Sequence, residues 1–376
     1  MRIGYDAKRA FKNNSGLGNY SRMVITGVSQ ALEPDGRVSL YTPGIKGPHE
    51  HYFDANSNVV SYMPAGLWAL FPSLWRSFGC RHAVVREGIQ IFHGLSHELP
   101  YGLPKNIKRV VTMHDLIVIR YPQFFKPVDR WIHRLKFRHA CRTADVVVAI
   151  SIQTKRDLVD LLHVPEHKIK VIYQSCDPIF WNSELRNQNL EIRNKYNLPE
   201  RYVISVGTVE ERKNQATAVR ALALLPPEVH LVIVGRPRGN YPQEVRLIAS
   251  ECGVEQRVIF LEKADFCDFP ALYAGALASV YMSVFEGFGI PVLESLCCDC
   301  PVVTSNISSM PEAGGDAALY ADPTDYQALA AHLRHLLDDP SFRQAQIEKG
   351  RTQKLMFAPQ KVSQEMLALY RSLLDN

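Results

Sequence analysis

The 376-residue sequence lacks the long apolar runs that membrane-spanning helices require. No stretch of about 18 apolar residues occurs, and the strand-like start Met1-Arg-Ile-Gly-Tyr5 does not resemble a signal peptide. Charge of one sign is also scarce, because 43 basic and 38 acidic residues leave a net charge of only +5, too little by itself to indicate nucleic-acid binding. We therefore expect a cytoplasmic globular protein whose contact with membrane, if any, is peripheral.

The eight cysteines do not show the spacing of a disulfide framework. Only three of them cluster, in Cys297-Cys-Asp-Cys300. A zinc site would require a second ligand pair at a suitable spacing, and no such pair is evident. We therefore expect no metal site and interpret the cluster as small residues at the end of a buried helix.

Length and composition favour two α/β domains. A chain of 376 residues exceeds what one core usually supports, and 46% hydrophobic residues suffice for large cores. Short apolar segments alternate with helix-length segments, which is typical of βαβ units and parallel sheets. The predicted strands are 59–63, 89–93, 109–113, 145–150 and 169–173 in a first set, and 202–206, 229–234, 257–261, 277–282 and 301–304 in a second. The polar, proline-bounded segment 177–199 between the two sets is predicted to be a hinge region.

A glycine-broken acidic loop, Ser283-Val-Phe-Glu-Gly-Phe-Gly-Ile-Pro-Val-Leu-Glu294, carries the strongest functional signal. The glycines on either side of Phe288 allow the backbone to approach a ligand closely, with its N–H groups directed at oxygens. The spacing of Glu286 and Glu294 alone would be uninformative, because carboxylate pairs at any fixed separation occur by chance. The surrounding sequence makes the loop a candidate site.

This loop leads from a strand into a helix. A strand-like run, 278–282, precedes it, and Pro291 suits the first turn of a helix that begins near Ile290. Such a loop lies at the carboxyl end of a parallel sheet, where open α/β folds bind ligands. The free N–H groups and the positive dipole end of the helix favour an anion, most naturally a phosphate. The alternative is an ordinary strand-to-helix turn with a capping Glu.

Several motifs, in the same order along the chain, resemble one family. Glu286 to Glu294 is similar to the Glu-x7-Glu motif of the retaining GT-B glycosyltransferases of family 4. The other matching stretches are Ser15-Gly-Leu-Gly-Asn-Tyr20, Ile91-Phe-His-Gly94, Thr112-Met-His-Asp115, Ser205-Val-Gly-Thr208, Glu211-Arg-Lys-Asn214 and the segment 304–323.

The resemblance covers nearly the whole chain and implies an α/β fold of two Rossmann-like domains that face each other across a cleft. It implies an acceptor domain over residues 1–180 and a nucleotide-sugar donor domain over residues 181–359. A C-terminal helix over 360–376 is expected to cross back to the first domain.

The reaction that the resemblance implies releases a nucleoside diphosphate, so cations are needed where negative charge develops. Arg212 and Lys213 match the family's pyrophosphate-binding pair, although a solvated charged loop is the alternative. The resemblance assigns Glu286 to orienting the donor sugar, with a covalent nucleophile as the alternative. It assigns Glu294 to the ribose hydroxyls, because both carboxylate oxygens accept hydrogen bonds.

Position in the motifs also implies a larger donor-binding set. Its members are Gly16, Gly18, Gly207, Thr208, Arg212, Lys213, Leu261, Lys263, Glu286, Gly287, Phe288, Gly289 and Glu294. Gly16 and Gly18 have the look of a flexible glycine loop over the phosphates, although a surface turn explains them as well. Around Leu261 and Lys263 the sequence departs from the family pattern, which often has glycine after this strand, and the identity of the nucleobase therefore stays open.

On the acceptor side, His114 matches a family position that lines the reaction centre. A neutral imidazole there could donate to a sugar hydroxyl or polarise the acceptor, and a structural histidine is the alternative. Asp115 is expected to orient the loop or cap the next segment, and His93 matches a second acceptor-side position. The implied catalytic residues are His114, Glu286, Arg212 and Lys213.

The overall pattern most resembles bacterial mannosyltransferases that use GDP-mannose. The predicted function is transfer of mannose to a saccharide or lipid-linked saccharide acceptor in surface polysaccharide (lipopolysaccharide) synthesis, with no metal or other cofactor. The alternatives are a transferase that uses a UDP- or dTDP-sugar, an NDP-sugar epimerase and a non-catalytic nucleotide-sugar binding protein. A phosphorylase would need a pyridoxal lysine, and none is identified.

Two segments, 67–86 and 130–142, combine aromatic and basic residues. They could rest on an anionic membrane surface and present the site to a lipid-linked acceptor. They could also be ordinary helices whose aromatic side chains enter the core, and we favour this second interpretation.

Overall fold

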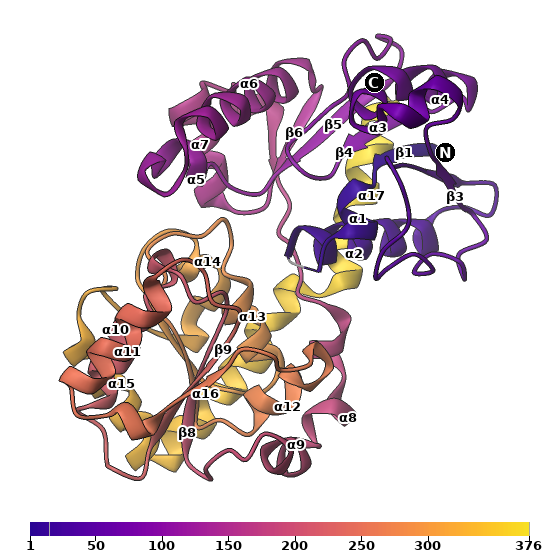
Figure 1. Ribbon diagram of the computed structural model, residues 1–376. Helices are drawn as coiled ribbons and strands as arrows, with labels where there is room; N and C mark the ends of the chain where they lie inside the picture. The colour runs from indigo at the N-terminus through magenta and orange to yellow at the C-terminus, as the bar shows by residue number, and fades with distance from the viewer. Residues whose placement is uncertain (15, 376) are drawn as a thin grey trace. The chain divides into compact units, whose positions relative to one another are not determined.

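A computed structural model describes residues 1–14 and 16–375. The chain forms two compact units (Figure 1). Unit 1 comprises Met1–Ser175 together with Phe357–Asn376, and unit 2 is the continuous segment Cys176–Met356. The domain boundaries expected from the sequence are after residue 180 and, where the chain crosses back to the first domain, at residue 360. Within the described residues, no helix is both long enough and apolar enough to span a bilayer.

Unit 1 is built on a seven-stranded sheet in the order β3-β2-β1-β4-β5-β6-β7, in which all neighbours are parallel. The strands are β1 Arg2–Asp6, β2 Arg37–Tyr41, β3 Val59–Tyr62, β4 Ile91–Gly94, β5 Lys108–Met113, β6 Val146–Ala149 and β7 Ile169–Val171. The α-helices are α1 Lys8–Lys12, α2 Gly16–Ala31, α3 Pro72–Leu74, α4 Cys80–Arg86, α5 Ile117–Arg120, α6 Pro127–Thr143, α7 Ile152–Leu162 and α17 Pro359–Leu374. Shorter turns are η1 Gly66–Leu70, η2 Trp75–Gly79, η3 Pro122–Phe124 and η4 Glu166–Lys168.

Unit 2 contains a six-stranded parallel sheet in the order β10-β9-β8-β11-β12-β13. Its strands are β8 Tyr202–Val206, β9 His230–Val234, β10 Val258–Leu261, β11 Ala278–Tyr281, β12 Val302–Ser305 and β13 Ala318–Ala321. Its α-helices are α8 Ser183–Arg186, α9 Asn189–Lys195, α10 Gln215–Leu222, α11 Tyr241–Glu251, α12 Phe269–Ala274, α13 Ile290–Cys297, α14 Met310–Gly314, α15 Tyr326–Asp338 and α16 Pro340–Gln353. The short helical turns are η5 Pro178–Trp181, η6 Glu211–Lys213, η7 Glu255–Arg257, η8 Phe266–Asp268, η9 Gly315–Ala317 and η10 Lys354–Phe357.

The central strands are nearly continuous apolar runs because helices cover both faces of each sheet. Strand β8 is buried along its whole length, and so are the last four residues of β9. Strands and flanking helices supply a large buried cluster in each unit. The two sheets therefore each carry a core of their own.

In both sheets the strand order reverses beside the first strand of the unit. Strand β1 lies between β2 and β4, and β8 lies between β9 and β11. Because successive connections leave to opposite sides, the loops after these strands diverge at the carboxyl edge, which is where open α/β sheets bind ligands. This topology locates one candidate site in each unit.

The predicted strands agree with the structure to within two residues at each end, and β2 and β13 are additional. The segment 177–199, predicted to be a hinge region, is folded as part of unit 2, because Phe180 and Ile192 are buried and α8 and α9 pack on α12. The cysteine cluster lies at the end of α13 with all three thiols buried, as interpreted from the sequence. All eight cysteines are free.

Candidate functional site

The loops that follow β8 and β11 meet at the reversal point of the unit 2 sheet. The register pairs Ala278 with Val203 and Ser279 with Ile204, so the two strands end side by side. The loop after β8 contains Arg212 and Lys213, and the loop after β11 contains Glu286. Chain topology therefore brings together residues that are more than 70 positions apart.

One oxygen of Glu286 is the centre of this cluster. Its Oε1 accepts hydrogen bonds from Arg212 Nη1 at 2.6 Å, Lys213 Nζ at 2.5 Å, Tyr281 Oη at 2.8 Å and Ser283 Oγ at 2.7 Å. All of the contacts described for this carboxylate within residues 1–14 and 16–375 are made by Oε1. The other oxygen, Oε2, is thus left for a further partner.

The electrostatic environment keeps Glu286 ionised. Burial alone would raise its pKa, but the charges of Lys213 and Arg212 and the hydrogen bonds outweigh burial and hold the pKa at about 2. Burial lowers the pKa of Lys213, and the Glu286 carboxylate opposes this shift. The result is a mostly buried carboxylate with two cations against it.

The backbone of Glu286 is fixed from the loop between β12 and α14. Ser308 Oγ accepts from the Glu286 N–H at 3.1 Å and donates to its carbonyl at 2.8 Å, and Ser309 Oγ donates to the same carbonyl at 2.9 Å. Ser308 has a φ of 59°, a left-handed conformation that a non-glycine residue seldom adopts. These contacts orient the Glu286 side chain through its own main chain.

Arg212 is held on both sides of its guanidinium. Nη1 also donates to the Phe285 carbonyl at 2.7 Å, and Nη2 donates to Glu210 Oε1 at 2.7 Å. Arg238 pairs with the other oxygen of Glu210 at 2.7 Å. The charged segment 210–213 is therefore an ordered cluster at the sheet edge, and the alternative of a solvated loop does not fit.

Helix α13 begins at Ile290, as the position of Pro291 predicts. Gly289 precedes it with a φ of 100°, a conformation that a side chain would strain. Gly287 is not among the residues with positive φ, so of the two glycines that flank Phe288 only Gly289 uses this freedom. Phe288 itself is buried and anchors the loop.

Glu294 lies in this helix and behaves unlike Glu286. It is buried, and its Oε2 accepts a hydrogen bond from Tyr273 Oη at 3.1 Å. Burial is the main cause that raises its pKa from 4.5 to about 8. The carboxyl group is therefore protonated near neutral pH in this structure.

A pH-dependent stability follows for Glu294. Between about pH 4.5 and 8 the folded protein keeps a proton on Glu294, whereas the unfolded chain has lost it. The stability that the protonated carboxyl group contributes is therefore fully present below pH 4.5 and is lost as the pH rises to 8. We expect Glu294→Gln, which does not titrate, to gain stability relative to the parent protein across this window, by a few kcal/mol at most. Chemical unfolding at pH 5.5 and 8.5 measures the difference.

The exposed Glu251→Gln variant is the control, and it should show no such pH-dependent gain. Equal stability differences for Glu294→Gln at both pH values would contradict the raised pKa.

The remaining predicted donor-binding residues of unit 2 lie at the same sheet edge. Gly207 has a φ of 142° and donates to the Val234 carbonyl at 2.9 Å, and the Thr208 carbonyl accepts from Gln215 at 3.1 Å. Leu261 ends β10 with its side chain half-buried, and Lys263 is exposed in the loop beyond it. The structure thus brings the unit 2 residues of the predicted set to the carboxyl ends of β8, β10 and β11.

Gly16 and Gly18 do not form the predicted flexible loop. They lie in the first turn of α2, and Ser15, the first residue of that motif, lies outside the described residues. A side chain at Gly18 would place its Cβ 1.9 Å from the Asn13 carbonyl oxygen, so the glycine serves a close approach of α2 to the preceding loop. This packing explains why a glycine pattern that suggests a loop is helical.

In unit 1, His114 lies after β5 in a buried, neutral state. Its Nε2 donates to the Leu95 carbonyl at 2.8 Å, and its backbone N–H donates to His97 Nε2 at 2.8 Å. Burial is the first cause that lowers the pKa of His114 to about 3, and His97 shows the same shift. Because Nε2 holds the proton, the other ring nitrogen of His114 can only accept, which corrects the expected donor role.

His93 does not suit the predicted acceptor-side role. It is fully buried, with Nε2 2.8 Å from Thr112 Oγ1 and Nδ1 2.5 Å from the Tyr370 hydroxyl of α17. Both ring nitrogens therefore have protein partners. Asp115 accepts from the Ile117 N–H at 3.1 Å at the start of α5, in agreement with the expected local orienting role.

Several residues of the two clusters escaped the sequence analysis. Tyr281 and Ser283 contact Glu286, and Tyr273 contacts Glu294. Tyr281 is the last residue of the strand before the acidic loop, and its hydroxyl at that strand end is the signal that could have identified it. His97 belongs to none of the recognised motifs, and its hydrogen bond with the His114 N–H becomes visible only in the folded structure.

No metal centre is evident in the part of the chain that the structure describes. There, no group of three or more His, Cys, Asp or Glu side chains is placed to hold a metal ion.

Comparison with known proteins gives a consistent result. The model of "Glycosyltransferase Family 4" matches residues 22–179, and that of "Glycosyl transferases group 1" matches residues 188–353. O-antigen chain mannosyltransferase B of Escherichia coli is 32% identical over 75% of this chain and 74% of its own length. An O-antigen chain mannosyltransferase of Salmonella typhimurium is 22% identical over 87% of this chain and 89% of its own length.

Among solved structures, HepE of Anabaena in complex with UDP and glucose is similar with a TM-score of 0.74. That alignment covers 99% of this chain and 100% of the other at 18% identity, which shows a shared GT-B fold of two Rossmann-like domains. The family models and the 32% identity over most of both chains decide the assignment. The chain belongs to the group 1 glycosyltransferases of family 4 and is a glycosyltransferase.

Proposed function

We propose that the enzyme transfers mannose from GDP-mannose to a saccharide or lipid-linked saccharide acceptor, with retention of anomeric configuration, on the cytoplasmic side of the membrane. The names of the two O-antigen chain mannosyltransferases among its relatives support this substrate class and a role in surface polysaccharide synthesis. The observation that carries the proposal is the Glu286 carboxylate with Arg212 and Lys213 on one of its oxygens.

The proposed reaction uses this cluster to manage charge. The bond between the sugar C1 and the phosphate oxygen breaks, the acceptor oxygen bonds to C1 on the same face, and the acceptor proton passes to the departing phosphate. Arg212 and Lys213 contact the diphosphate, where negative charge grows as the bond breaks. Glu286 accepts hydroxyl hydrogen bonds from the sugar and orients it, through Oε2, since the described protein contacts are all made by Oε1. No step requires a metal or another cofactor.

The other proposed contacts follow from position. Backbone amides of 287–289 contact sugar hydroxyls or phosphate at the start of α13. Glu294 binds the ribose hydroxyls, and its carboxyl group can both donate and accept while protonated. Leu261, at the end of β10, and Lys263, in the loop after it, are the proposed contacts to the nucleobase.

On the acceptor side we propose that His114 accepts a hydrogen bond through Nδ1 from a sugar hydroxyl. Its Nε2 proton is committed to the Leu95 carbonyl, which fixes this tautomer. Its ring packs nearly perpendicular to the Tyr20 ring, with centroids 4.7 Å apart, so the imidazole has little freedom to turn. His114 is thus a rigid acceptor group in the proposal.

The nucleotide preference provides the test. We expect GDP to raise the unfolding temperature more than UDP, dTDP or ADP, because a ligand at about 100 times its dissociation constant adds roughly 2.7 kcal/mol of stability. Thermal unfolding with each nucleotide in turn measures this preference. Release of GDP over time from GDP-mannose plus acceptor then separates a transferase from a protein that only binds the donor.

A clear preference for UDP or dTDP would replace mannose by another donor class and leave the glycosyltransferase assignment intact. GDP binding without GDP release in the presence of acceptor sugars would favour the binding-protein alternative.

A further inference from the structure

Large apolar side chains are exposed in two segments of unit 1. We define the apolar-basic surface as residues 66–86, which comprise η1, α3, η2 and α4, and residues 126–143, which comprise α6 and the residue before it. Its exposed apolar side chains are Leu67, Trp68, Leu70, Phe71, Leu74, Phe78, Val85, Val128, Trp131, Ile132 and Leu135. Leu67 is 84% exposed, Leu70 72% and Trp131 65%. Of the aromatic residues in these segments only Trp75 and Phe137 are buried, so the favoured interpretation of core-facing helices is wrong for most of them.

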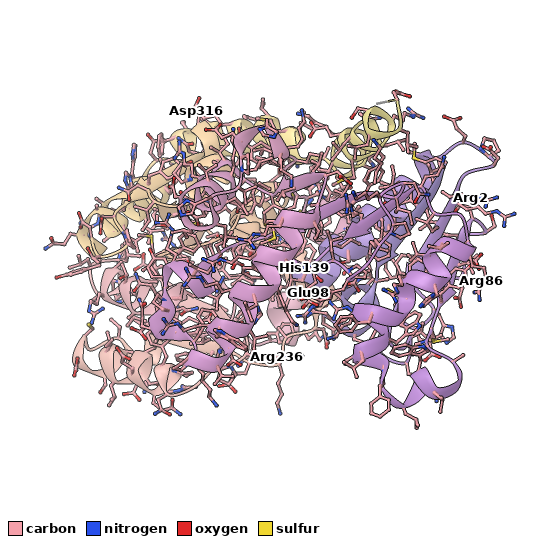
Figure 2. All side chains as sticks on the ribbon, turned by 90° about the horizontal axis from the view of Figure 1, so that it is seen from above. Arg2, Arg86, Glu98, His139, Arg236 and Asp316 are labelled. Atoms are coloured by element: carbon pink, nitrogen blue, oxygen red, sulfur yellow. The ribbon has the colours of Figure 1, made fainter. Side chains whose placement is uncertain are left out.

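Side-chain contacts join the two segments into one surface. Phe78 of η2 stacks on Tyr101 with ring centroids 4.9 Å apart, and Tyr101 stacks on His139 of α6 at 3.8 Å. Glu98 pairs with Arg76 of the first segment and accepts from Lys136 of the second at 3.0 Å. Figure 2 looks onto this part of unit 1, with Glu98 beside His139 and Arg86 at the end of α4.

The excess of positive charge in the protein is concentrated on the same surface. The two segments contain nine of the 43 basic residues and one of the 38 acidic residues, so the remainder of the chain, with 34 basic and 37 acidic residues, has a net charge of −3. On α6, four arginines recur at every fourth position along one side of the helix, and all are exposed. They are Arg130, Arg134, Arg138 and Arg142.

This combination points to one kind of partner. Exposed Leu and Trp side chains insert into the boundary between headgroups and acyl chains, while arginines reach anionic headgroups with their long stems in apolar surroundings. A second copy of this chain would bring two equally basic surfaces together, and this repulsion disfavours self-association. The basic residues are spread over two segments, so they fit an extended anionic surface better than a small ligand in a pocket.

We propose that the apolar-basic surface docks the protein on a bilayer that contains anionic phospholipids. The surface adjoins the carboxyl edge of the unit 1 sheet, because Arg76 also binds Asp6 at the end of β1, with Nε 2.9 Å from Oδ2. The docking deepens the proposed function and rests on it in one respect, namely that a lipid-linked acceptor would lie in the same bilayer.

Vesicle sedimentation tests the proposal with the full chain and no donor. The vesicles consist of phosphatidylcholine alone or of phosphatidylcholine with phosphatidylglycerol. Leu67→Ser/Leu70→Ser removes exposed apolar contact, and its matched control Leu247→Ser/Leu355→Ser changes two leucines of unit 2 that are also mostly exposed. Arg134→Glu/Arg138→Glu reverses two charges, and its control Lys349→Glu/Lys361→Glu makes the same change in net charge elsewhere.

We expect the parent protein and both controls to sediment with phosphatidylglycerol vesicles, and high salt to weaken binding. Each test variant should bind at least about tenfold more weakly. Absence of binding by the parent protein, or equal binding by test and control variants, would overturn the proposal. A dimer in light scattering that Leu67→Ser/Leu70→Ser dissociates, without vesicle binding, would identify a second copy as the occupant instead.

The same proteins are assayed for the GDP-induced shift in unfolding temperature, which uses unit 2 residues and no membrane. Lost vesicle binding with an intact GDP shift concerns the docking surface only. Vesicle binding by a parent protein that shows no shift with any nucleotide contradicts the proposed donor site and leaves the docking surface standing.

Discussion

Glu286→Ala is expected to reduce sugar transfer by at least about 100- to 1,000-fold, because the donor sugar loses the carboxylate that orients it and balances the charge of two cations. GDP binding should change far less, since GDP lacks the mannosyl group that Glu286 orients, and Arg212 and Lys213 remain. Initial rates of GDP release with acceptor present measure transfer, and GDP titration measures binding.

Two variants make this result specific. Glu286→Gln keeps the size of the side chain and removes its charge, so it should also be nearly inactive if the carboxylate is required. Glu251→Ala, on the exposed side of α11, should retain full activity. Near-normal turnover by Glu286→Ala would remove the assigned role, and a glycosylated Glu286 trapped in mass spectra would favour the covalent alternative.

The second large effect concerns the two cations. Arg212→Ala and Lys213→Met should each weaken GDP binding by about 10- to 100-fold, which corresponds to about 1 to 3 kcal/mol for a charged contact. Lys213→Met preserves most of the side-chain volume, so the loss reflects charge. Calorimetric titration with GDP measures both affinities.

Stability needs a separate measurement here, because removing one partner of the mostly buried Glu286 cluster leaves charge uncompensated. Unfolding in denaturant shows whether each variant is folded at the titration temperature. Arg201→Ala serves as a control, since Arg201 precedes β8 at the amino edge of the sheet and the side chains of Arg201 and its partner Glu228 are both exposed. Unchanged GDP affinity in folded Arg212→Ala and Lys213→Met would place the pyrophosphate contact elsewhere.

The acidic loop was predictable because its signals are local. Gly289 and Pro291 constrain the backbone by their own chemistry, and the start of α13 follows from them. Likewise, apolar runs such as 202–206 suit buried parallel strands whatever lies beside them. Local chemistry therefore accounts for the positions of the strands and of the Glu286 loop.

The features that the sequence did not reveal depend on residues far apart in the chain. His93 looks like a site residue until Tyr370, 277 positions later, takes its Nδ1. The protonation of Glu294 depends on how deeply α13 is buried, which no motif records. In each case a tertiary contact overrides a correct local signal.

Helix α17 has a consequence for how the protein forms during synthesis. It packs beside α2 (Figure 1), and its Tyr370 is buried against Tyr5 and His93, so unit 1 is completed by residues that follow unit 2 in the sequence. Unit 2, by contrast, is continuous and can fold as soon as it leaves the ribosome. We therefore expect unit 1, whose first 175 residues precede unit 2 in the sequence, to be completed after unit 2, with the face of α2 that contacts α17 uncovered until α17 has been made.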